Sequence, residues 1–454
     1  MSIHSKDENK NPTQFSRRSF LARSLAAASA SPLLIDGWSR TASAALDPAK
    51  APQINAGFVA PQYYDKHEEE SLIDVLEEGS PFRFYGQGKA VKVKEFEEGF
   101  ANYMGAPYAL AVTSGTTALN SAITGLGIGP GDEVIVPAYT WWSDYTCVVH
   151  AGALPVFADI DESMCLDPQS FEKAITPRTK AVIAVHLLGG PCDMDPIMDI
   201  AKKKGIAVLE DCAQCVGGSY HGKKLGTIGD VGIYSFQLHK MISSGEGGAV
   251  VTGNPLIYER ACRFHNMGGF DELFKNRIGK TQLSNFAGEN YRMNEFTGAV
   301  LWAQLPKLDT MIRDMRRNAE AVRDGIKDLP GIKKRKRPDP QGDIGYAVYI
   351  ETKSKEQCDQ FLAELRKRKV PCSRLTGSVL LPVAESVMQK QTRHPNWPSF
   401  TSPEGKAIEY GPDTCRQTLD IYDRFVQIRI GPKYTDEMND WIIAGVREVY
   451  SQLT

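Results

Sequence analysis

The chain has 454 residues, more than one hydrophobic core usually serves, so we expect two domains. Apolar residues make up 42% and charged residues 24% of the sequence, as in ordinary globular proteins. The formal net charge of -2 leaves no broad basic field, which disfavours nucleic acid as a partner.

The first 45 residues have the features of an export signal. Arg17-Arg18 precedes a stretch rich in alanine, serine and leucine that runs to Ile35, and Ala42-Ser43-Ala44 offers the small side chains that a signal peptidase needs. We therefore expect residues 1–45 to direct export by the twin-arginine route, to the periplasm or another extracytoplasmic compartment. No second long apolar run follows, so no membrane segment is expected in the mature form. The alternative is a disordered tail that contains an arginine pair by chance.

Short apolar runs alternate with helix-length segments within residues 46–310. Such alternation is typical of a mostly parallel sheet covered by helices on both faces, and it predicts a large α/β domain. The predicted strands are 108–112, 133–137, 181–185, 206–210 and 231–236. A helix is predicted from Asp195 to Gly205, and turns at Gly129–Asp132 and Gly152–Pro155.

The pattern changes at residue 311. A charged helical stretch at 311–329 predicts a linker helix, and the basic run Lys333–Arg337 follows it. That run suits either a nucleic-acid patch or a solvated surface, and we favour the solvated surface. The rest predicts a small C-terminal α+β domain, with strands at 346–351 and 425–430, helices at 355–369 and the C-terminus, and a loop-rich insertion at 394–414 that either borders a substrate entrance or is a surface loop.

The segment Thr113–Leu119 follows a predicted strand and opens a predicted helix. Its small residues, Gly115 and Thr116 among them, leave backbone N–H groups exposed at a helix N-terminus, where the helix dipole favours a phosphate. The competing interpretation is an ordinary N-cap, because serine and threonine are common at that position.

Asp211 stands at the carboxyl end of the predicted strand 206–210. Ligands of open α/β sheets bind at this edge, and an acid there can serve a cationic ring nitrogen. Alternatively, Asp211 caps the segment that follows. Nearby Cys212 and Cys215 form a C-x-x-C, which leaves a redox pair open, but no second pair completes a zinc site and no metal site is predicted.

Lys240 lies just past the strand 231–236 and before the glycine-rich turn Gly245–Gly248. Core packing does not place an ammonium group there, because it needs water or a partner. Partial burial lowers the pKa of such a lysine and makes its amine a nucleophile and then a base, which suits a Schiff-base role. A solvated surface lysine is the alternative.

Taken in chain order, these segments offer a phosphate anchor, an acid for a ring nitrogen and an amine for a covalent link, as pyridoxal 5'-phosphate (PLP) requires. Together with E-N-Y-R-M-N-E at 289–295, the segments T-S-G-T-T-A-L, V-P-A-Y-T-W, V-H-L-L-G, E-D-C-A-Q, S-F-Q-L-H-K and G-E-G-G-A-V-V-T resemble the DegT-type sugar aminotransferases of PLP fold type I. The resemblance covers essentially all of 55–454. S-F-Q before the lysine, with Cys415–Asp420 near the end, resembles the branch that aminates keto-cyclitols.

The resemblance implies a role for each matching residue. Lys240 would bind PLP covalently, and Asp211 would keep the ring nitrogen protonated. Trp141 would stack on the ring, and Gln214 would hydrogen-bond its phenolic oxygen. The residues that would bind the phosphate are Gly115, Thr116, Ser235 and, from the neighbouring subunit, Asn290, so the resemblance implies a homodimer with a shared active site.

The implied reaction transfers an amino group from glutamine or glutamate to a keto-sugar or keto-cyclitol. Tyr85 and Arg292 are hypothetical substrate contacts, from their places in the F-Y-G and R-M segments. Relatives that act as dehydratases have histidine in place of the lysine; here His239 precedes Lys240, which favours transamination.

Two other classes of function remain open. A nicotinamide-dependent oxidoreductase fits poorly, since neither Gly86-Gln87-Gly88 nor Gly127-Ile128-Gly129 completes G-x-G-x-x-G after a strand. A non-catalytic or sensory protein that keeps PLP remains a competing hypothesis, because export separates the protein from cytoplasmic nucleotide sugars.

Overall fold

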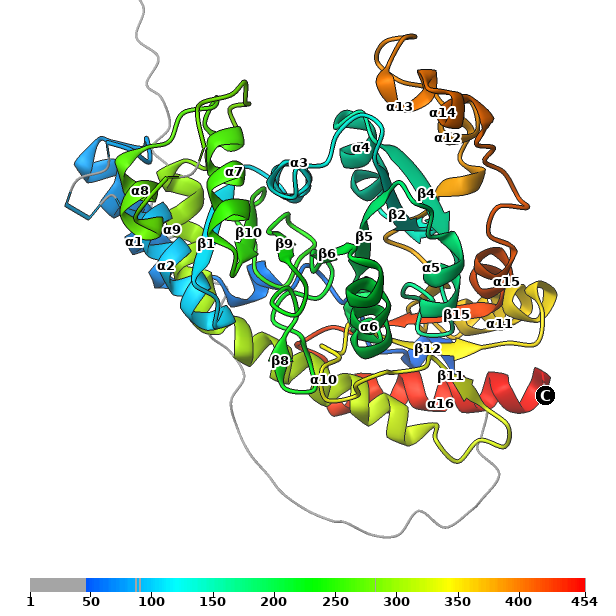
Figure 1. Ribbon diagram of the computed structural model, residues 1–454. Helices are drawn as coiled ribbons and strands as arrows, with labels where there is room; N and C mark the ends of the chain where they lie inside the picture. Colours follow the sequence, from blue (N-terminus) through cyan, green and yellow to red (C-terminus); the bar gives the residue numbers. More distant parts are fainter. Residues whose placement is uncertain (1–45, 86–87, 90, 282, 454) are drawn as a thin grey trace, which may run out of the picture. The chain divides into compact units, whose positions relative to one another are not determined.

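Seven strands form the large sheet, in the order β1-β10-β9-β6-β5-β2-β4 (Figure 1). Strands β4, β2, β5, β6 and β9 run parallel, while β10 is antiparallel to both of its neighbours. The strands are Tyr108–Val112 (β1), Glu133–Pro137 (β2), Leu154–Ala158 (β4), Thr179–Val185 (β5), Ala207–Asp211 (β6), Val231–Ser235 (β9) and Gly248–Thr252 (β10). The mostly parallel α/β sheet expected from the sequence is confirmed.

This computed structural model describes residues 46–85, 88–89, 91–281 and 283–453. Contacts group Leu46–Thr454 into one compact unit, which holds both of the larger sheets of the described residues. The expected export signal lies outside the described residues. Among the described helices, none combines the length and apolarity needed to cross a bilayer.

The strands have continuous apolar sequences because they are buried. Every residue of β2, β9 and β10 is buried, as expected for strands covered on both faces. The expected turn at 152–155 is partly wrong: Gly152, with φ +77°, makes the turn, but Leu154 already begins β4. Pro155 is tolerated there because β4 is an edge strand and pairs with β2 alone.

Helices surround the large sheet. They are Lys66–Glu78 (α1), Lys92–Met104 (α2), Gly115–Gly125 (α3), Trp142–His150 (α4), Pro168–Ala174 (α5), Met194–Lys204 (α6), Pro255–His265 (α7), Glu272–Ile278 (α8) and Glu295–Gln304 (α9). Helix α6 ends at Gly205, whose left-handed φ of +65° stops it where the sequence predicted. Helix α3 packs against α4, α7 and β9, which brings its N-terminus to the edge of the sheet where β9 ends.

A second, four-stranded antiparallel sheet lies in the C-terminal part, in the order β11-β12-β15-β13. Its strands are Lys333–Lys334 (β11), Ala347–Glu351 (β12), Cys372–Arg374 (β13) and Phe425–Arg429 (β15). The long helices of this part are Leu308–Gly325 (α10), Lys355–Lys367 (α11) and Asp436–Leu453 (α16), and α10 and α11 both pack against α16. They enclose a hydrophobic cluster of their own, which includes Phe361, Val426 and Ile442.

Short elements connect the two sheets. Strand β14 (Val379–Leu380) pairs with β3 (Tyr139–Thr140), so the C-terminal part supplies a strand directly beside the segment that leads into α4. The remaining short elements are β7 (Ser219–Tyr220), β8 (Lys223–Lys224), α12 (Glu385–Met388), α13 (Pro398–Thr401), α14 (Pro403–Ala407) and α15 (Arg416–Arg424), with 3-10 turns at Pro48–Lys50, Ala60–Tyr63, Leu187–Gly189, Leu305–Lys307 and Leu381–Val383.

The expectation of a solvated basic run at 333–337 is wrong for Arg335. Its side chain is buried and donates to the backbone carbonyls of Ser163, Leu187 and Leu188. A guanidinium carries five donors in a fixed fork, so it can satisfy several buried carbonyls at once. Arg335 therefore ties the C-terminal part to the large sheet rather than facing solvent.

Candidate active site

A cavity of about 600 Å³ opens where β6 and β9 end and α3 begins. Most of the residues singled out in the sequence line it together: Gly115, Thr116, Trp141, Asp211, Gln214, Ser235 and Lys240. The strand-order argument for these residues thus agrees with their placement in space. They meet at the carboxyl edge of the parallel strands, where α/β proteins bind ligands.

The N-terminus of α3 forms one end of the cavity. Ser114 caps the helix, its Oγ accepting from Thr117 N at 3.1 Å, but no described residue accepts from the N–H groups of Gly115 and Thr116. A Cβ on Gly115 would lie 2.7 Å from the Cβ of Ser235, so only glycine lets the helix end approach β9 this closely. Both interpretations of this segment hold: it is a serine N-cap and it presents free donors to the cavity.

Hydroxyl groups surround these donors. Thr116 Oγ1 and Ser143 Oγ, on α3 and α4, are hydrogen-bonded at 2.7 Å. Ser235 adds a third hydroxyl from the end of β9. Together with the free N–H groups they can bind the oxygens of a phosphate.

Asp211 is buried at the carboxyl end of β6, with 5% of its surface exposed. Its Oδ1 accepts from Ala213 N at 2.7 Å, so it caps the next turn as well as lining the cavity. Burial raises the pKa of Asp211, while the bond from Ala213 and the charge of Lys240 act in the opposite direction.

Lys240 reaches the cavity from the turn after β9, where its backbone N–H donates to Gln237 O at 2.9 Å. Burial lowers the pKa of Lys240, and the carboxyls of Asp211, Asp144 and Glu246 act against that shift. A lysine whose pKa is lowered holds more of its amine in the neutral, nucleophilic form.

Trp141 and Gln214 also line the cavity. Trp141 precedes α4 and leaves 51% of its surface exposed, which is unusual for tryptophan and leaves an aromatic face free toward the cavity. Gln214 is held by hydrogen bonds from Leu188 N to its Oε1 and from its Nε2 to Gly377 O. Its role toward a phenolic oxygen remains a prediction.

The model of the DegT/DnrJ/EryC1/StrS aminotransferase family matches residues 63–447. The chain belongs to this family. It is therefore an aminotransferase, and the expected family and class of enzyme are confirmed.

Named relatives agree with the match. A GDP-perosamine synthase of Escherichia coli O157:H7 is 33% identical over 346 residues, 73% of this chain and 90% of that protein. An L-glutamine:2-deoxy-scyllo-inosose aminotransferase of Streptomyces kanamyceticus is 39% identical over 236 residues, 50% of this chain and 55% of its own length. The crystal structure of 3-amino-5-hydroxybenzoic acid synthase has a TM-score of 0.71 at 28% identity, over 89% of this chain and 99% of that one. The fold is that of PLP fold type I aminotransferases, as expected.

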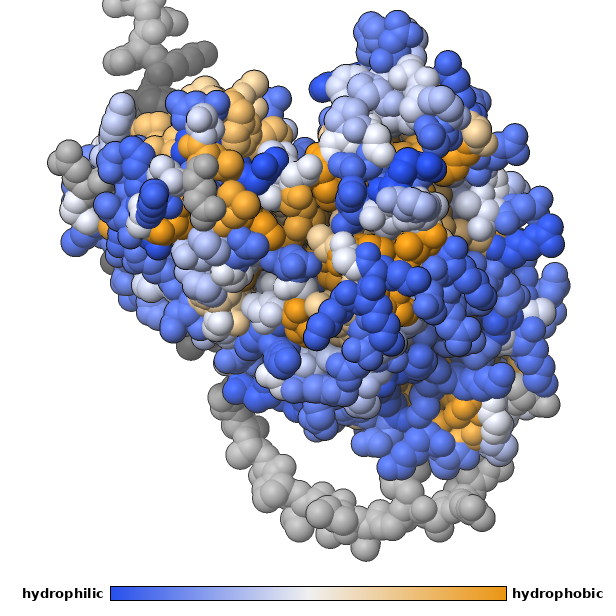
Figure 2. All heavy atoms as spheres, viewed as in Figure 1, coloured by the Kyte–Doolittle hydropathy of each residue, from blue (hydrophilic) through white to orange (hydrophobic). Residues whose placement is uncertain are grey.

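Three residues singled out in this aminotransferase do not line the cavity of their own chain. Asn290 is exposed and bridges the backbone of Asn266, and Arg292 Nη1 donates to Asn266 Oδ1 at 2.9 Å. Tyr85 is 71% exposed and packs edge-on against Phe82, over which the Arg292 guanidinium also lies, 5.4 Å from the ring centre. Figure 2 shows apolar residues at the surface over the region of α7, and further apolar surface across the centre of the view.

The wall opposite Asp211 was missed in the sequence. It comes from the C-terminal part and consists of Ile344, Tyr346, Thr376, Gly377 and Arg429. Arg429 ends β15 with its guanidinium over the Tyr346 ring at 5.9 Å, and no described acid forms an ion pair with it. Its place at the end of the predicted strand 425–430 was a usable signal, because a charged residue closing an apolar strand often faces a site.

His239 lies at the rim of the Lys240 cavity. The His239 ring meets Phe58 edge-on at 4.8 Å, and its Nδ1 lies 2.9 Å from Gln237 Oε1.

Cys212 and Cys215 are buried free thiols, and burial raises the pKa of both. Thiols that stay protonated are poor nucleophiles, which argues against the redox interpretation.

His186, Glu210 and Cys212 lie close enough together to suggest a metal site. The Glu210 carboxylate, however, accepts from the N–H groups of Gly226, Ile228 and Gly229 and lies 2.9 Å from His186 Nε2. His186 Nδ1 accepts from Cys192 N at 3.0 Å, which fixes the proton on Nε2. These groups are satisfied by the protein and hold the strand ends beneath the cavity.

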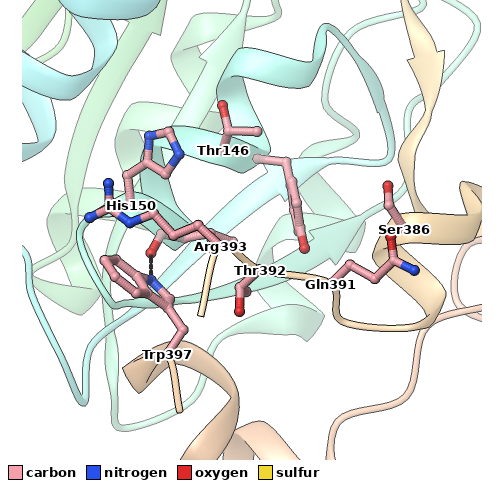
Figure 3. Close-up of a pocket in the computed structure, with 9 residues that line it drawn as sticks. Thr146, His150, Ser386, Gln391, Thr392, Arg393 and Trp397 are labelled. Carbon is pink, nitrogen blue, oxygen red and sulfur yellow. Dashed lines mark hydrogen bonds between the residues drawn. The ribbon is translucent and has the colours of Figure 1, made fainter. Parts of the chain in front are cut away.

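A second cavity, of about 280 Å³, lies between α4 and residues of the segment 386–397 (Figure 3). Thr146 and His150 of α4 face Arg393 and Trp397, whose guanidinium and ring are stacked at 4.1 Å. Trp397 Nε1 donates to Val149 O, which docks the 394–414 insertion on α4. No residue of that insertion is among the described residues that line the Lys240 cavity, so the surface-loop interpretation fits better than an entrance.

Proposed function

We propose that this aminotransferase binds PLP through Lys240 and transfers an amino group from glutamine or glutamate to a keto-sugar or keto-cyclitol. The observation that carries the proposal is that Lys240, Asp211 and the free N–H groups of α3 face one cavity. The fit is chemical as well as spatial: an anion site at one end, a buried acid and an amine of lowered pKa suit a phosphate, a ring nitrogen and an aldehyde, respectively. When bound, PLP supplies a carbonyl carbon that links amines and a ring that accepts their electrons.

The chain's own residues divide the work. The Gly115 and Thr116 N–H groups hold the phosphate, and Trp141 stacks on the ring face. The Asp211 carboxylate holds a proton on the ring nitrogen. The neutral amine of Lys240 would serve as the base that takes the proton from the donor carbon bearing the amino group, and the resulting ammonium would then serve as the acid that gives this proton back to complete the transfer.

The wall is suited to the substrates. Arg429 lies in the cavity without a described acidic partner, so its guanidinium is available for the α-carboxylate of the amino donor. Thr376 offers a hydroxyl and Gly377 backbone polar groups to a polyol acceptor. A sugar acceptor agrees with the name of the perosamine relative, and a glutamine donor and cyclitol acceptor with that of the scyllo-inosose relative.

Borohydride reduction of the purified protein tests the cofactor assignment. We expect a pyridoxyl mass on the peptide that contains Lys240, and none in Lys240→Ala. A screen of keto-sugars and keto-cyclitols with glutamine and glutamate then separates an aminotransferase from a sensory protein or a dehydratase. Absence of the pyridoxyl adduct from the wild-type peptide contradicts the proposal, and so does a cofactor-loaded protein that aminates none of the acceptors.

We further propose a homodimer in which Asn290 completes the partner's phosphate site. Asn290 is exposed and lies outside its own cavity, and Met267, whose N–H donates to Glu289 O, is 60% exposed beside it. Exposed apolar side chains of this kind mark interaction surfaces. Mixing inactive Asn290→Ala with inactive Lys240→Ala should restore activity, because one site of each mixed dimer has both residues. Failure of a proven mixed dimer to regain activity rules out the shared site.

Export by the twin-arginine route is proposed from residues 1–45. Replacing Arg17 and Arg18 by lysine should retain the protein in the cytoplasm, and cell fractionation measures this. Unchanged export of the double variant contradicts the assignment.

A further inference from the structure

A second buried carboxyl lies beneath the candidate active site. Asp144, in the first turn of α4, has no exposed surface, and its side chain is a neighbour of Asp211. The family resemblance assigned no role to it. Two buried acids side by side need an explanation, because a dry site does not hold two adjacent negative charges.

The hydrogen bonds of Asp144 distinguish its two oxygens. Thr140 Oγ1 donates to Oδ2 at 2.5 Å. With both acids written as carboxylates, Oδ1 has no hydrogen-bond partner, although it is buried. A proton on Oδ1 resolves this, since Oδ1 can then donate to the Asp211 carboxylate beside it.

Helix capping does not account for Asp144. An acid in the first turn of a helix is often placed there to accept from free N–H groups or to complement the helix dipole. No described backbone N–H donates to the Asp144 carboxyl, and its one donor is the Thr140 hydroxyl on the preceding strand. The side chain therefore turns toward β6 rather than back onto its own helix.

The surrounding charges agree with this arrangement. Burial and the adjacent Asp211 raise the pKa of Asp144 well above its usual range, and the hydrogen bond from Asp144 acts to lower that of Asp211. Lys240 favours the ionised form of both carboxyls, and His186 favours that of Asp211. The buried thiols of Cys147 and Cys212 also interact with the pair, and burial and nearby carboxyls, Asp211 among them, raise the pKa of both thiols. These directions agree with the unpartnered Oδ1 in favouring one proton for the pair, on Asp144.

We propose that Asp144 is a neutral acid that donates a hydrogen bond to Asp211, holding that carboxylate ionised and oriented toward the cofactor ring. Asp144 is a positioning residue, since it acts through Asp211 and does not line the cavity. The inference rests on the proposed function, in which Asp211 pairs with a ring nitrogen. The pair places a single negative charge opposite Lys240 where two carboxylates would repel each other.

Two variants separate this role from a structural one. Asp144→Asn is uncharged, accepts from Thr140 and donates to Asp211, so it reproduces the proposed state. Asp144→Leu has similar bulk but no donor. The measurement is cofactor absorbance as a function of pH. We expect the midpoint of this pH titration to lie within about 0.3 pH unit of wild type in Asp144→Asn and about one pH unit lower in Asp144→Leu, because Asp211 without its hydrogen-bond donor is protonated more often. PLP affinity should change less than threefold in Asn and fall by about tenfold in Leu.

Opposite outcomes overturn the inference. If Asp144 is ionised, Asp144→Asn removes a negative charge and lowers the midpoint as well. If Asp144 merely fills space, Asp144→Leu matches wild type in both midpoint and affinity. Thermal unfolding of each apoprotein reports whether the variant is folded.

Infrared spectroscopy of the apoprotein tests the protonation state without the cofactor. A protonated carboxyl has its own C=O band. We expect one such band in the wild-type minus Asp144→Asn difference spectrum near neutral pH, where the band of Glu295, whose pKa is raised to about 7, cancels because both proteins contain it. Identical spectra contradict the proposal. If the wild-type protein binds no PLP, the proposed function fails, yet the band still decides the state of Asp144.

Discussion

The floor and the wall of the Lys240 cavity differ in which sheet of the protein supplies their residues. The floor consists of Gly115, Asp211 and Lys240. Asp211 ends β6, while Gly115 and Lys240 follow β1 and β9 of the same sheet, so their chemistry could be recognised from spacing along the chain. The wall residues Tyr346 and Arg429 come from a second sheet whose register with the first has no signature in the sequence. In the proposed function, the floor determines the type of reaction and the wall determines the substrates.

The largest effect is expected from the floor. Replacing Asp211 by asparagine keeps the shape but removes the charge opposite the ring nitrogen, and we expect kcat to fall about 100- to 1000-fold. Steady-state kinetics at saturating donor and acceptor measure this. Asp132→Asn, which alters a turn carboxyl that accepts from Gly129 N, is the control and should leave kcat unchanged. A fall confined to KM would place Asp211 in substrate binding instead.

Substitutions in the wall should change the KM for the substrates more than kcat. Arg429→Gln removes the charge proposed to bind the donor carboxylate, and we expect the KM for the donor to rise about 10- to 100-fold with cofactor absorbance unchanged. Arg416→Gln is the matched control, because Arg416 is exposed and paired with Asp413 outside the cavity. An unchanged donor KM in Arg429→Gln would exclude Arg429 as the carboxylate partner.

Crowding the floor should loosen the cofactor. In Gly115→Ala the new Cβ meets Ser235 at 2.7 Å, which shifts the end of α3 and its two free N–H groups, and PLP affinity should fall about tenfold. Titrating the apoprotein with PLP measures the change. Gly129→Ala meets nothing within 4 Å and should bind PLP like wild type. Equal affinities for both variants would show that α3 does not hold the phosphate.

The smallest kinetic effect is expected outside both regions. Burial raises the pKa of Glu295 from 4.5 to about 7, so between these values the folded state binds more protons than the unfolded state and stability falls as pH rises. Glu295→Gln should remove this loss and stabilise the protein above pH 7 by about 2–3 kcal/mol. Denaturant unfolding from pH 4.5 to 8 measures it, with kcat near wild type. A pH dependence equal to that of wild type would contradict the assignment.

Local patterns predicted most of the fold. β1 and β2 match the expected ranges because their residues are apolar and bounded by turn residues. The burial of Arg335 could not be predicted, because its carbonyl partners are more than 140 positions away and a buried arginine gives the same local sequence as a solvated one. The role proposed for Asp144 could not be predicted for the same reason. It depends on Asp211, which lies 67 positions later in the chain and comes near only because α4 packs against the sheet.

The two-residue ladder between β3 and β14 has an evolutionary consequence. Thr140 pairs with Val379, so the strand that precedes Trp141 is hydrogen-bonded to the strand that follows Thr376 and Gly377. A change of that loop toward a new acceptor would also move the backbone that positions the Trp141 indole, which we propose stacks on the cofactor ring. If both assignments hold, we expect substitutions that alter substrate preference in this loop to be accompanied by substitutions that restore the position of the indole.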